Sequence, residues 1–165
     1  MIVTILKKMG WLVVLVLVQV LVLNRIHILG YATPFLYIYL IVKMEYRIPR
    51  SVILLIGFLL GLTMDMFTNT LGVNASATVL LAFMQPFFLK MFAPRDVEDD
   101  LVPERRQIGT WSFCKYVVLC VCPHHTVLLM LEYFTFVGIL QTLLRIVVCS
   151  LFTIIMILAV DKAIN

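Results

Sequence analysis

Long apolar stretches alternate with short polar segments along almost the whole chain. They predict six membrane-spanning helices, at residues 11–23, 32–42, 52–67, 75–91, 111–131 and 136–160. A helix of about 20 apolar residues crosses the hydrocarbon core of a bilayer, and a shorter one suffices where its ends reach the surface. The second stretch is the shortest, because polar and charged residues flank it. We therefore expect an all-α polytopic membrane protein with a single domain over residues 1–165.

One of these stretches carries a stripe of small residues. Gly57, Gly61 and Asp65 recur every four residues, so a helix places them on one face. Glycines at this spacing let another helix backbone approach closely, which in lipid largely replaces the hydrophobic effect as the source of helix association. We expect a helix-packing or partner-binding face here. Gly72 and Asn74, in the following turn, are assigned to the same face as a hypothesis, and Asn74 is expected to cap the next helix.

Composition and charge agree with a membrane protein. Of 165 residues, 63% are hydrophobic and 13% are charged, about half the charged share of a soluble domain. Eleven Lys and Arg residues fall on one side of the predicted spans, whereas Arg25 lies on the other and Arg145 lies inside the last span. Because such an excess marks the cytoplasmic side, both termini and the loop 93–109 are predicted to be cytoplasmic. The net charge of +4 then requires no nucleic acid partner.

The N-terminus imitates a signal peptide. Lys7 and Lys8 precede an apolar run, and residues 30–32 form a passable cleavage site. We expect no cleavage, because a polar break at residues 24–27 separates the run from that site and because the remaining chain is also apolar.

Isolated polar side chains lie within the predicted spans. Gln19 is expected to hydrogen-bond to a neighbouring helix. His124 and His125 are adjacent, so on a helix they point about 100° apart and do not form the i, i+4 pair that binds a metal. We expect them to form hydrogen bonds inside the bundle. No metal or cofactor is predicted.

Arg145 has a long stem that reaches toward the outer surface of the membrane. Asp65 lies near the same surface, so an ion pair between the two is a hypothesis, with Glu132 as the competing partner.

Catalytic motifs are absent from the sequence. It contains no Gly-x-Ser-x-Gly, no His-Glu-x-x-His, no glycine-rich phosphate loop and no second intramembrane aspartate to pair with Asp65. The four cysteines show no Cys-x-x-Cys spacing and are expected to be small buried residues. We therefore expect a binding or scaffold protein and not an enzyme. The loop 93–109 is expected to be a solvated loop or short interfacial helix, or else a docking surface for a cytoplasmic partner.

Several short motifs follow one another in a fixed order. After Asn24-Arg25-Ile26-His27 and Tyr31-Ala32-Thr33-Pro34-Phe35 come the Gly57, Gly61 and Asp65 stripe, then Asn69, Leu71-Gly72 and Asn74, then Pro94-Arg95-Asp96 and finally His124-His125-Thr126. In this order, and in chain length, the sequence resembles the rod shape-determining protein family MreD, in the form of its Bacteroides-type members.

The resemblance implies a six-helix component of the bacterial inner membrane that acts in cell-shape control and peptidoglycan synthesis. Family members bind the bitopic membrane protein MreC. Through it they are linked to an actin-like filament, a penicillin-binding transpeptidase and a SEDS glycosyltransferase. The family fold is similar to that of the substrate-binding subunits of energy-coupling-factor vitamin transporters, which supplies an alternative function.

Two functions thus remain open. A scaffold would present an external groove at Gly57 and Gly61 to the membrane helix of a partner. A transporter subunit would enclose a pocket that opens outward, lined by Asp65, Asn69, Asn74, His124 and Arg145. The first predicted span lacks the small-x-x-x-small pattern expected for docking an energising module, which weighs against transport.

Overall fold

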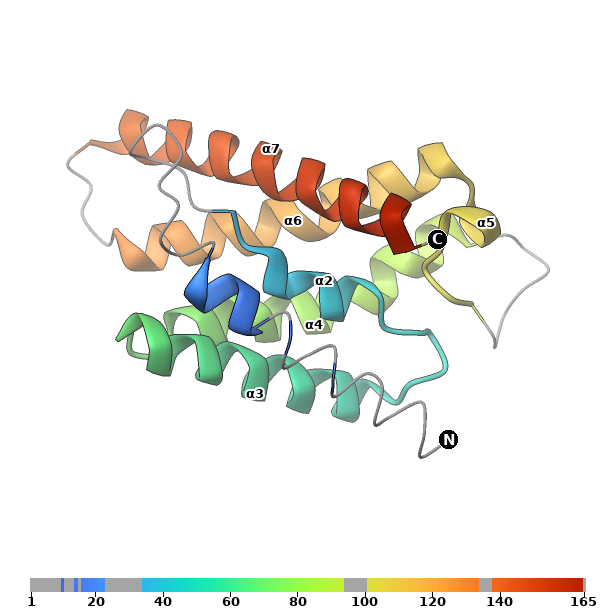
Figure 1. The fold of residues 1–165 in the computed structure, drawn as a ribbon, viewed down its shortest axis with the longest axis horizontal. Helices are drawn as coiled ribbons and strands as arrows, with labels where there is room; N and C mark the ends of the chain where they lie inside the picture. The colour runs from blue at the N-terminus through green and yellow to red at the C-terminus, as the bar shows by residue number, and fades with distance from the viewer. Residues whose placement is uncertain are drawn as a thin grey trace.

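A computed structural model of the chain describes residues 10, 14, 16–22, 34–93, 101–133 and 138–164, and the regular structure among them is helical (Figure 1). Four helices are long and apolar enough to cross a membrane: α3 (Arg50–Thr68), α4 (Val73–Phe92), α6 (Thr110–Glu132) and α7 (Ile139–Ile164). They confirm the predicted helices at 52–67, 75–91, 111–131 and 136–160. The short elements are η2 (Leu36–Ile38), α2 (Tyr39–Val42) and α5 (Arg105–Ile108).

Several predictions concern residues outside the described part of the chain. These are most of residues 1–15, with Lys7 and Lys8, the segment 23–33 with Arg25, and the acidic run within 94–100. Of the predicted first span, residues 16–21 are described and are helical.

The four long helices are arranged side by side and alternate in direction. α4 packs between α3 and α6, and α7 packs against α6 (Figure 1). Together with residues 16–21 they surround residues 34–44, which we call the central segment.

The central segment differs from the prediction of a continuous helix over 32–42. From Pro34 it is irregular, and then it forms one 3₁₀ turn and one α-helical turn, which together cover about 12 Å. Tyr37, Ile38, Ile41 and Val42 are each 0% exposed. The segment packs inside the bundle and not against lipid, so its backbone need not be fully helical.

The glycine stripe lies at a close contact between two helices. A Cβ added at Gly57 would lie 2.8 Å from the Ala82 Cβ, and one at Gly61 would lie 2.5 Å from the Ala75 Cα, so α3 approaches α4 at these positions. The stripe therefore lies at a close contact between two helices, as its spacing indicates. Its partner is a helix of the same chain, which leaves these glycines covered and corrects the expected external groove.

The outer faces of α3 and α7 are apolar. Side chains that are more than half exposed follow helical spacing on each, at Leu55, Leu59 and Met66 on α3 and at Leu140, Leu144, Val147, Leu151 and Ile155 on α7. Such faces suit contact with lipid or with another apolar helix.

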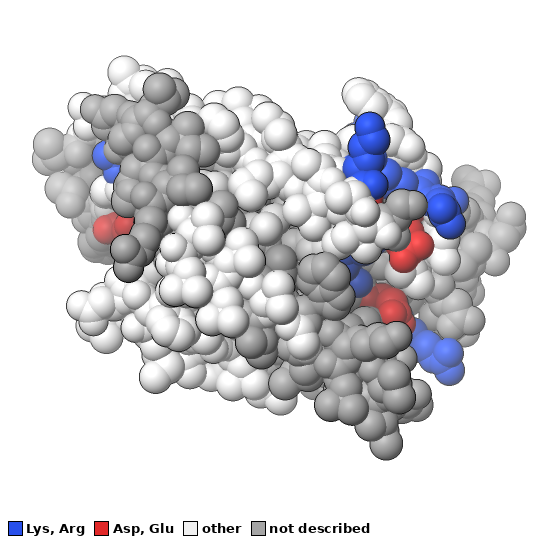
Figure 2. Space-filling view, viewed as in Figure 1, with Lys and Arg blue, Asp and Glu red and all other residues white. Residues whose placement is uncertain are grey.

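Positive charge gathers at one end of the bundle (Figure 2). Nine Lys and Arg residues are described: eight lie at the end where α3 and α6 begin and where α4 and α7 finish, and Arg145 lies near the other end. We call these the basic end and the opposite end.

Candidate functional site

Asp65 lies on α3 at the opposite end and holds the start of α4. Its carboxylate accepts hydrogen bonds from the backbone N–H groups of Asn74 and Ala75, both at 2.9 Å, from the Asn74 amide at 3.1 Å and from the Thr70 hydroxyl at 2.5 Å. All of these partners are donors, and the start of a helix favours negative charge. The carboxylate therefore caps α4 from a neighbouring helix.

This corrects two expectations for the turn between α3 and α4. Asn74 does not cap its own helix, because it lies within the first turn and its amide donates to Asp65. Gly72 is the N-cap residue, with φ of +79°, and a Cβ there would meet nothing within 4 Å. Its role is therefore conformational, because this backbone region favours glycine, and it makes no close packing contact.

From Asn74 the hydrogen bonds continue across the bundle. The Tyr37 hydroxyl of the central segment donates to Asn74 Oδ1 at 3.1 Å and lies 3.2 Å from His124 Nε2 on α6. The hydroxyl has one hydrogen, so His124 Nε2 must be the donor of the second bond. His124 is 0% exposed, which confirms its expected hydrogen-bonding role inside the bundle.

His125 continues the chain of hydrogen bonds to α7. Its Nδ1 donates to the Val121 carbonyl at 3.0 Å, so its Nε2, 3.0 Å from the Thr153 hydroxyl, is the acceptor of that bond. Thr153 in turn accepts the Phe35 N–H at 3.1 Å. Thus α7 holds the beginning of the central segment through Thr153, and His125 holds the Thr153 hydroxyl.

Other side chains form hydrogen bonds with the backbone groups at the two ends of the central segment. Gln19 donates to the Pro34 carbonyl at 2.8 Å and accepts the Leu36 N–H at 2.7 Å, so its predicted hydrogen bond is to this segment. At the far end the Tyr116 hydroxyl donates to the Val42 carbonyl, and the Gln85 amide donates to the Met44 carbonyl. Irregular backbone at membrane depth is tolerated where protein groups satisfy it in this way.

The hydrogen bonds run in one direction within two parts of the network. Thr153 donates to His125, and His124 donates to Tyr37, Tyr37 to Asn74 and Asn74 to Asp65. His125 itself donates to the Val121 carbonyl. The two histidines are linked by a long contact of 3.5 Å between their Nδ1 atoms. Hydrogen bonds aligned in this way polarise one another, so the network rigidifies the centre of the bundle.

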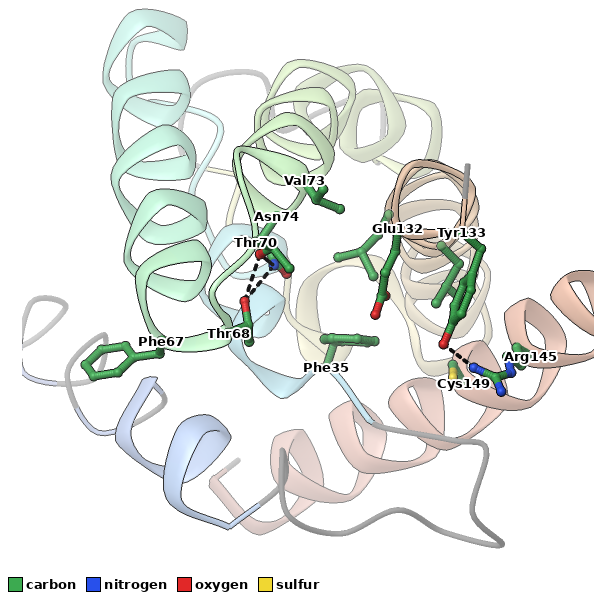
Figure 3. A pocket seen from close by; sticks show the side chains of 12 residues that line it. Phe35, Phe67, Thr68, Thr70, Val73, Asn74, Glu132, Tyr133, Arg145 and Cys149 are labelled. Atoms are coloured by element: carbon green, nitrogen blue, oxygen red, sulfur yellow. Dashed lines mark hydrogen bonds between the residues drawn. The ribbon is translucent and has the colours of Figure 1, made fainter. Parts of the chain in front are cut away.

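A pocket of about 310 Å³ opens at the opposite end, between the α3–α4 turn and the facing ends of α6 and α7 (Figure 3). It reaches Phe35, at the start of the central segment. Thr68, Thr70 and Asn74 line one side. Glu132, Tyr133 and Arg145 line the facing side.

The pocket agrees only in part with the lining predicted for a transporter subunit. Asn74 and Arg145 line it, whereas Asp65, Asn69 and His124 are not among its lining residues. Asp65 and His124 lie behind this lining, since each is one hydrogen bond from Asn74 or from its partner Tyr37.

The hypothesis of an Asp65–Arg145 ion pair is not supported by the contacts. The Asp65 carboxylate is occupied by Thr70, Asn74 and Ala75. Arg145 instead donates to the Tyr133 hydroxyl, and its guanidinium lies 4.7 Å from the centre of the Tyr133 ring. Arg145 thus reaches toward Tyr133 at the opposite end of the bundle.

A buried ion cluster at the basic end was not predicted. Asp161 on α7 is 0% exposed and pairs with Lys43 Nζ at 3.0 Å and with Arg105 Nε at 2.8 Å. Lys43 also donates to the Pro103 carbonyl at 3.1 Å. The cluster therefore fastens the described part of the loop 93–109 to the bundle. The position of Asp161 beside Lys162, at the end of an apolar run, was the available signal, but it is equally typical of a residue at the membrane surface.

No three His, Cys, Asp or Glu side chains within the described ranges are grouped so that they could hold a metal ion. All four cysteines are free thiols; Cys120 and Cys149 are buried, as predicted, whereas Cys122 is exposed.

No protein-family model matches this sequence, and comparison with curated proteins and with solved structures gave no match either. The fold and the site are therefore interpreted from their own geometry.

Proposed function

We propose that the protein is a non-catalytic scaffold of the bacterial inner membrane that binds a bitopic partner of the MreC type within the bilayer. In this role it would link that partner, and through it the filament and the peptidoglycan synthases, to cell-shape control. The resemblance of its ordered motifs to the MreD family motivates the choice of partner.

The proposal rests on the observation that the buried polar side chains form hydrogen bonds within the protein itself. Five polar side chains are buried and bind the chain's own backbone or its other buried side chains: Gln19, Tyr37, Gln85, Tyr116 and Thr153. What the bundle offers to a neighbour within the bilayer is therefore its apolar outer surface, above all on α3 and α7. A partner helix would pack there, since the glycine stripe is already covered by α4.

The proposed orientation follows from charge. Because Lys and Arg concentrate on the cytoplasmic side of membrane proteins, the basic end would face the cytoplasm and the pocket would face outward. The chain would then cross six times, with residues 11–23 as the first crossing and the central segment as the inner part of the second. Both termini would be cytoplasmic.

Co-purification with a tagged MreC-type protein tests the scaffold role. We would compare the unaltered chain with Val147→Gln on α7 and Leu59→Gln on α3, which are 56% and 51% exposed. We expect one of these variants to lose the partner while keeping the melting temperature of the unaltered protein. Failure of the unaltered chain to capture the partner, or full capture by both variants, would contradict the proposal.

The pocket favours a second candidate, a substrate-binding membrane subunit of a small-molecule transporter. Its volume of about 310 Å³ is at the lower limit for small-molecule sites, and in the proposed orientation it opens outward. Recovery of a bound small molecule from protein purified without a partner would support this candidate over the scaffold.

A further inference from the structure

The polar groups on the two sides of the pocket differ in their ability to donate hydrogen bonds to a ligand. On the α3–α4 side, the Thr70 hydroxyl donates to Asp65, and the Thr68 hydroxyl donates to the Met64 carbonyl. The Asn74 amide donates to Asp65 and to Thr70. The Thr70 and Asn74 oxygens also accept one hydrogen bond each, from the Asn74 amide and from the Tyr37 hydroxyl, and the Thr68 and Thr70 hydroxyls lie 2.8 Å apart. Because the hydrogens are committed and each oxygen has two lone pairs, any further hydrogen bond to these oxygens must be one that they accept. A ligand must therefore donate hydrogen bonds to this side.

Negative charge strengthens that preference. The Asp65 carboxylate lies one hydrogen bond behind Thr70 and Asn74, and the Glu132 carboxyl lines the pocket from the facing side. The rings of Phe35, Phe67 and Tyr133 also line the pocket, and aromatic faces attract cations. These features together favour a ligand group that is both a donor and positively charged, that is, an ammonium group.

The facing side also supplies positive charge. Arg145 lines the pocket with Glu132, and its guanidinium is anchored by the Tyr133 hydroxyl and ring. A guanidinium is a donor without acceptor atoms and matches phosphate or carboxylate oxygens. The same pocket therefore favours an anionic group beside the ammonium group.

From this lining we infer that the pocket binds a compact zwitterion, in which an ammonium group and an anionic oxygen group are joined by a short chain. The ammonium group contacts Asn74, Thr70 and Glu132, and the anionic group contacts Arg145. Leu128 and Leu129, which also line the pocket, accommodate the carbon atoms. A free aminoalkyl phosphate and the head group of an ethanolamine phospholipid share this chemistry.

This inference goes beyond the scaffold role, and for the second candidate function it names the class of ligand. The assay uses the full chain without a partner. Failure to bind the ligand would therefore not argue against the scaffold role, and failure to capture the partner would not argue against ligand binding.

Binding can be measured as a rise in melting temperature and by native mass spectrometry of the purified chain. The probes are O-phosphoethanolamine in detergent, and nanodiscs of choline phospholipid containing either phosphatidylethanolamine or phosphatidylglycerol. Stabilisation by the free molecule assigns the ligand to solution, and stabilisation by phosphatidylethanolamine alone assigns it to the membrane. Equal effects of both nanodisc lipids, or no effect of any probe, would overturn the inference.

Variants separate the two halves of the site. Glu132→Gln and Arg145→Gln should each weaken binding at least about tenfold, because each removes a charged hydrogen-bonding partner. Lys90→Gln is the matched control, since Lys90 is exposed at the basic end, and it should bind as the unaltered chain does. Native-like melting of the ligand-free variants would show that they fold. Unchanged affinity in both pocket variants would refute the assignment.

Discussion

Replacing Gly61 by alanine tests the close contact between α3 and α4. The added Cβ would lie 2.5 Å from the Ala75 Cα and 2.7 Å from the Asn74 carbonyl oxygen, whereas ordinary contact begins at 3.4 Å. To relieve the first contact, α3 and α4 must separate locally by the difference between 3.4 and 2.5 Å, about 0.9 Å. The added Cβ would also clash with the Thr78 hydroxyl, but because two of the three nearest atoms are backbone, rotation of the Thr78 side chain alone would not relieve the contact.

This separation acts directly on the Asp65 cap. The two backbone N–H bonds to Asp65 are 2.9 Å long, and a shift of about 0.9 Å along them would take them beyond hydrogen-bonding distance. Overpacking alone costs about 1–3 kcal/mol, and weakened hydrogen bonds to a charged group add to it. We expect a loss of about 3 kcal/mol, which for a chain of this length corresponds to a fall in melting temperature of about 6–12 °C.

The assay is thermal unfolding of the purified protein in one detergent, followed by circular dichroism. Gly10→Ala is the matched control, because Gly10 is exposed and a Cβ there meets nothing within 4 Å. Gly57→Ala should destabilise less, since its main clash at 2.8 Å is with the Ala82 Cβ, and Ala82→Gly should rescue it. If Gly61→Ala melts at the temperature of the Gly10→Ala control, the inferred packing of α3 on α4 is wrong.

Three further substitutions test the polar contacts. Asp65→Ala and Arg145→Ala should lower the free energy of unfolding additively, within about 0.5 kcal/mol, because the two residues belong to separate networks. Strong coupling in a double-mutant cycle would instead support the hypothesis of an ion pair between them. Asp161→Asn removes the buried charge that pairs with two partly buried cations, so we expect a loss of about 3 kcal/mol and faster proteolysis of the loop 101–109; unchanged cleavage would contradict this. Tyr37→Phe removes the hydroxyl bonded to Asn74 and His124 and should cost about 1–3 kcal/mol by thermal unfolding; an unchanged melting temperature would contradict this.

The four long helices were predicted well because the length of an apolar stretch can be read directly from the sequence. Each observed helix begins and ends within four residues of its predicted bounds, as for α3 at Arg50–Thr68 against 52–67. The central segment was harder to predict. Its aromatic and aliphatic residues suggest a helix in lipid, but whether a segment faces lipid or protein depends on helices far along the chain.

For the site, too, local sequence patterns indicated which residues were unusual, but not which distant residues they contact. The spacing of Gly57 and Gly61 correctly indicates that a helix backbone comes close, yet it does not tell which helix comes. Asp65 was recognised as unusual, but its partners lie in the turn and the next helix, where Asn74 by itself resembles a cap. The Asp161 cluster depends on Lys43 and Arg105, which are far from it in sequence, and no local pattern joins them.

The stabilisation of the central segment also constrains the order of assembly. The Phe35 N–H relies on Thr153, 118 residues further along the chain, and Lys43 relies on Asp161 at the same separation. A nascent chain that has not yet produced α7 cannot satisfy these groups. We therefore expect this segment to reach its final packing only after α7 has been synthesised, because before then the Phe35 N–H and the Lys43 ammonium group lack these partners.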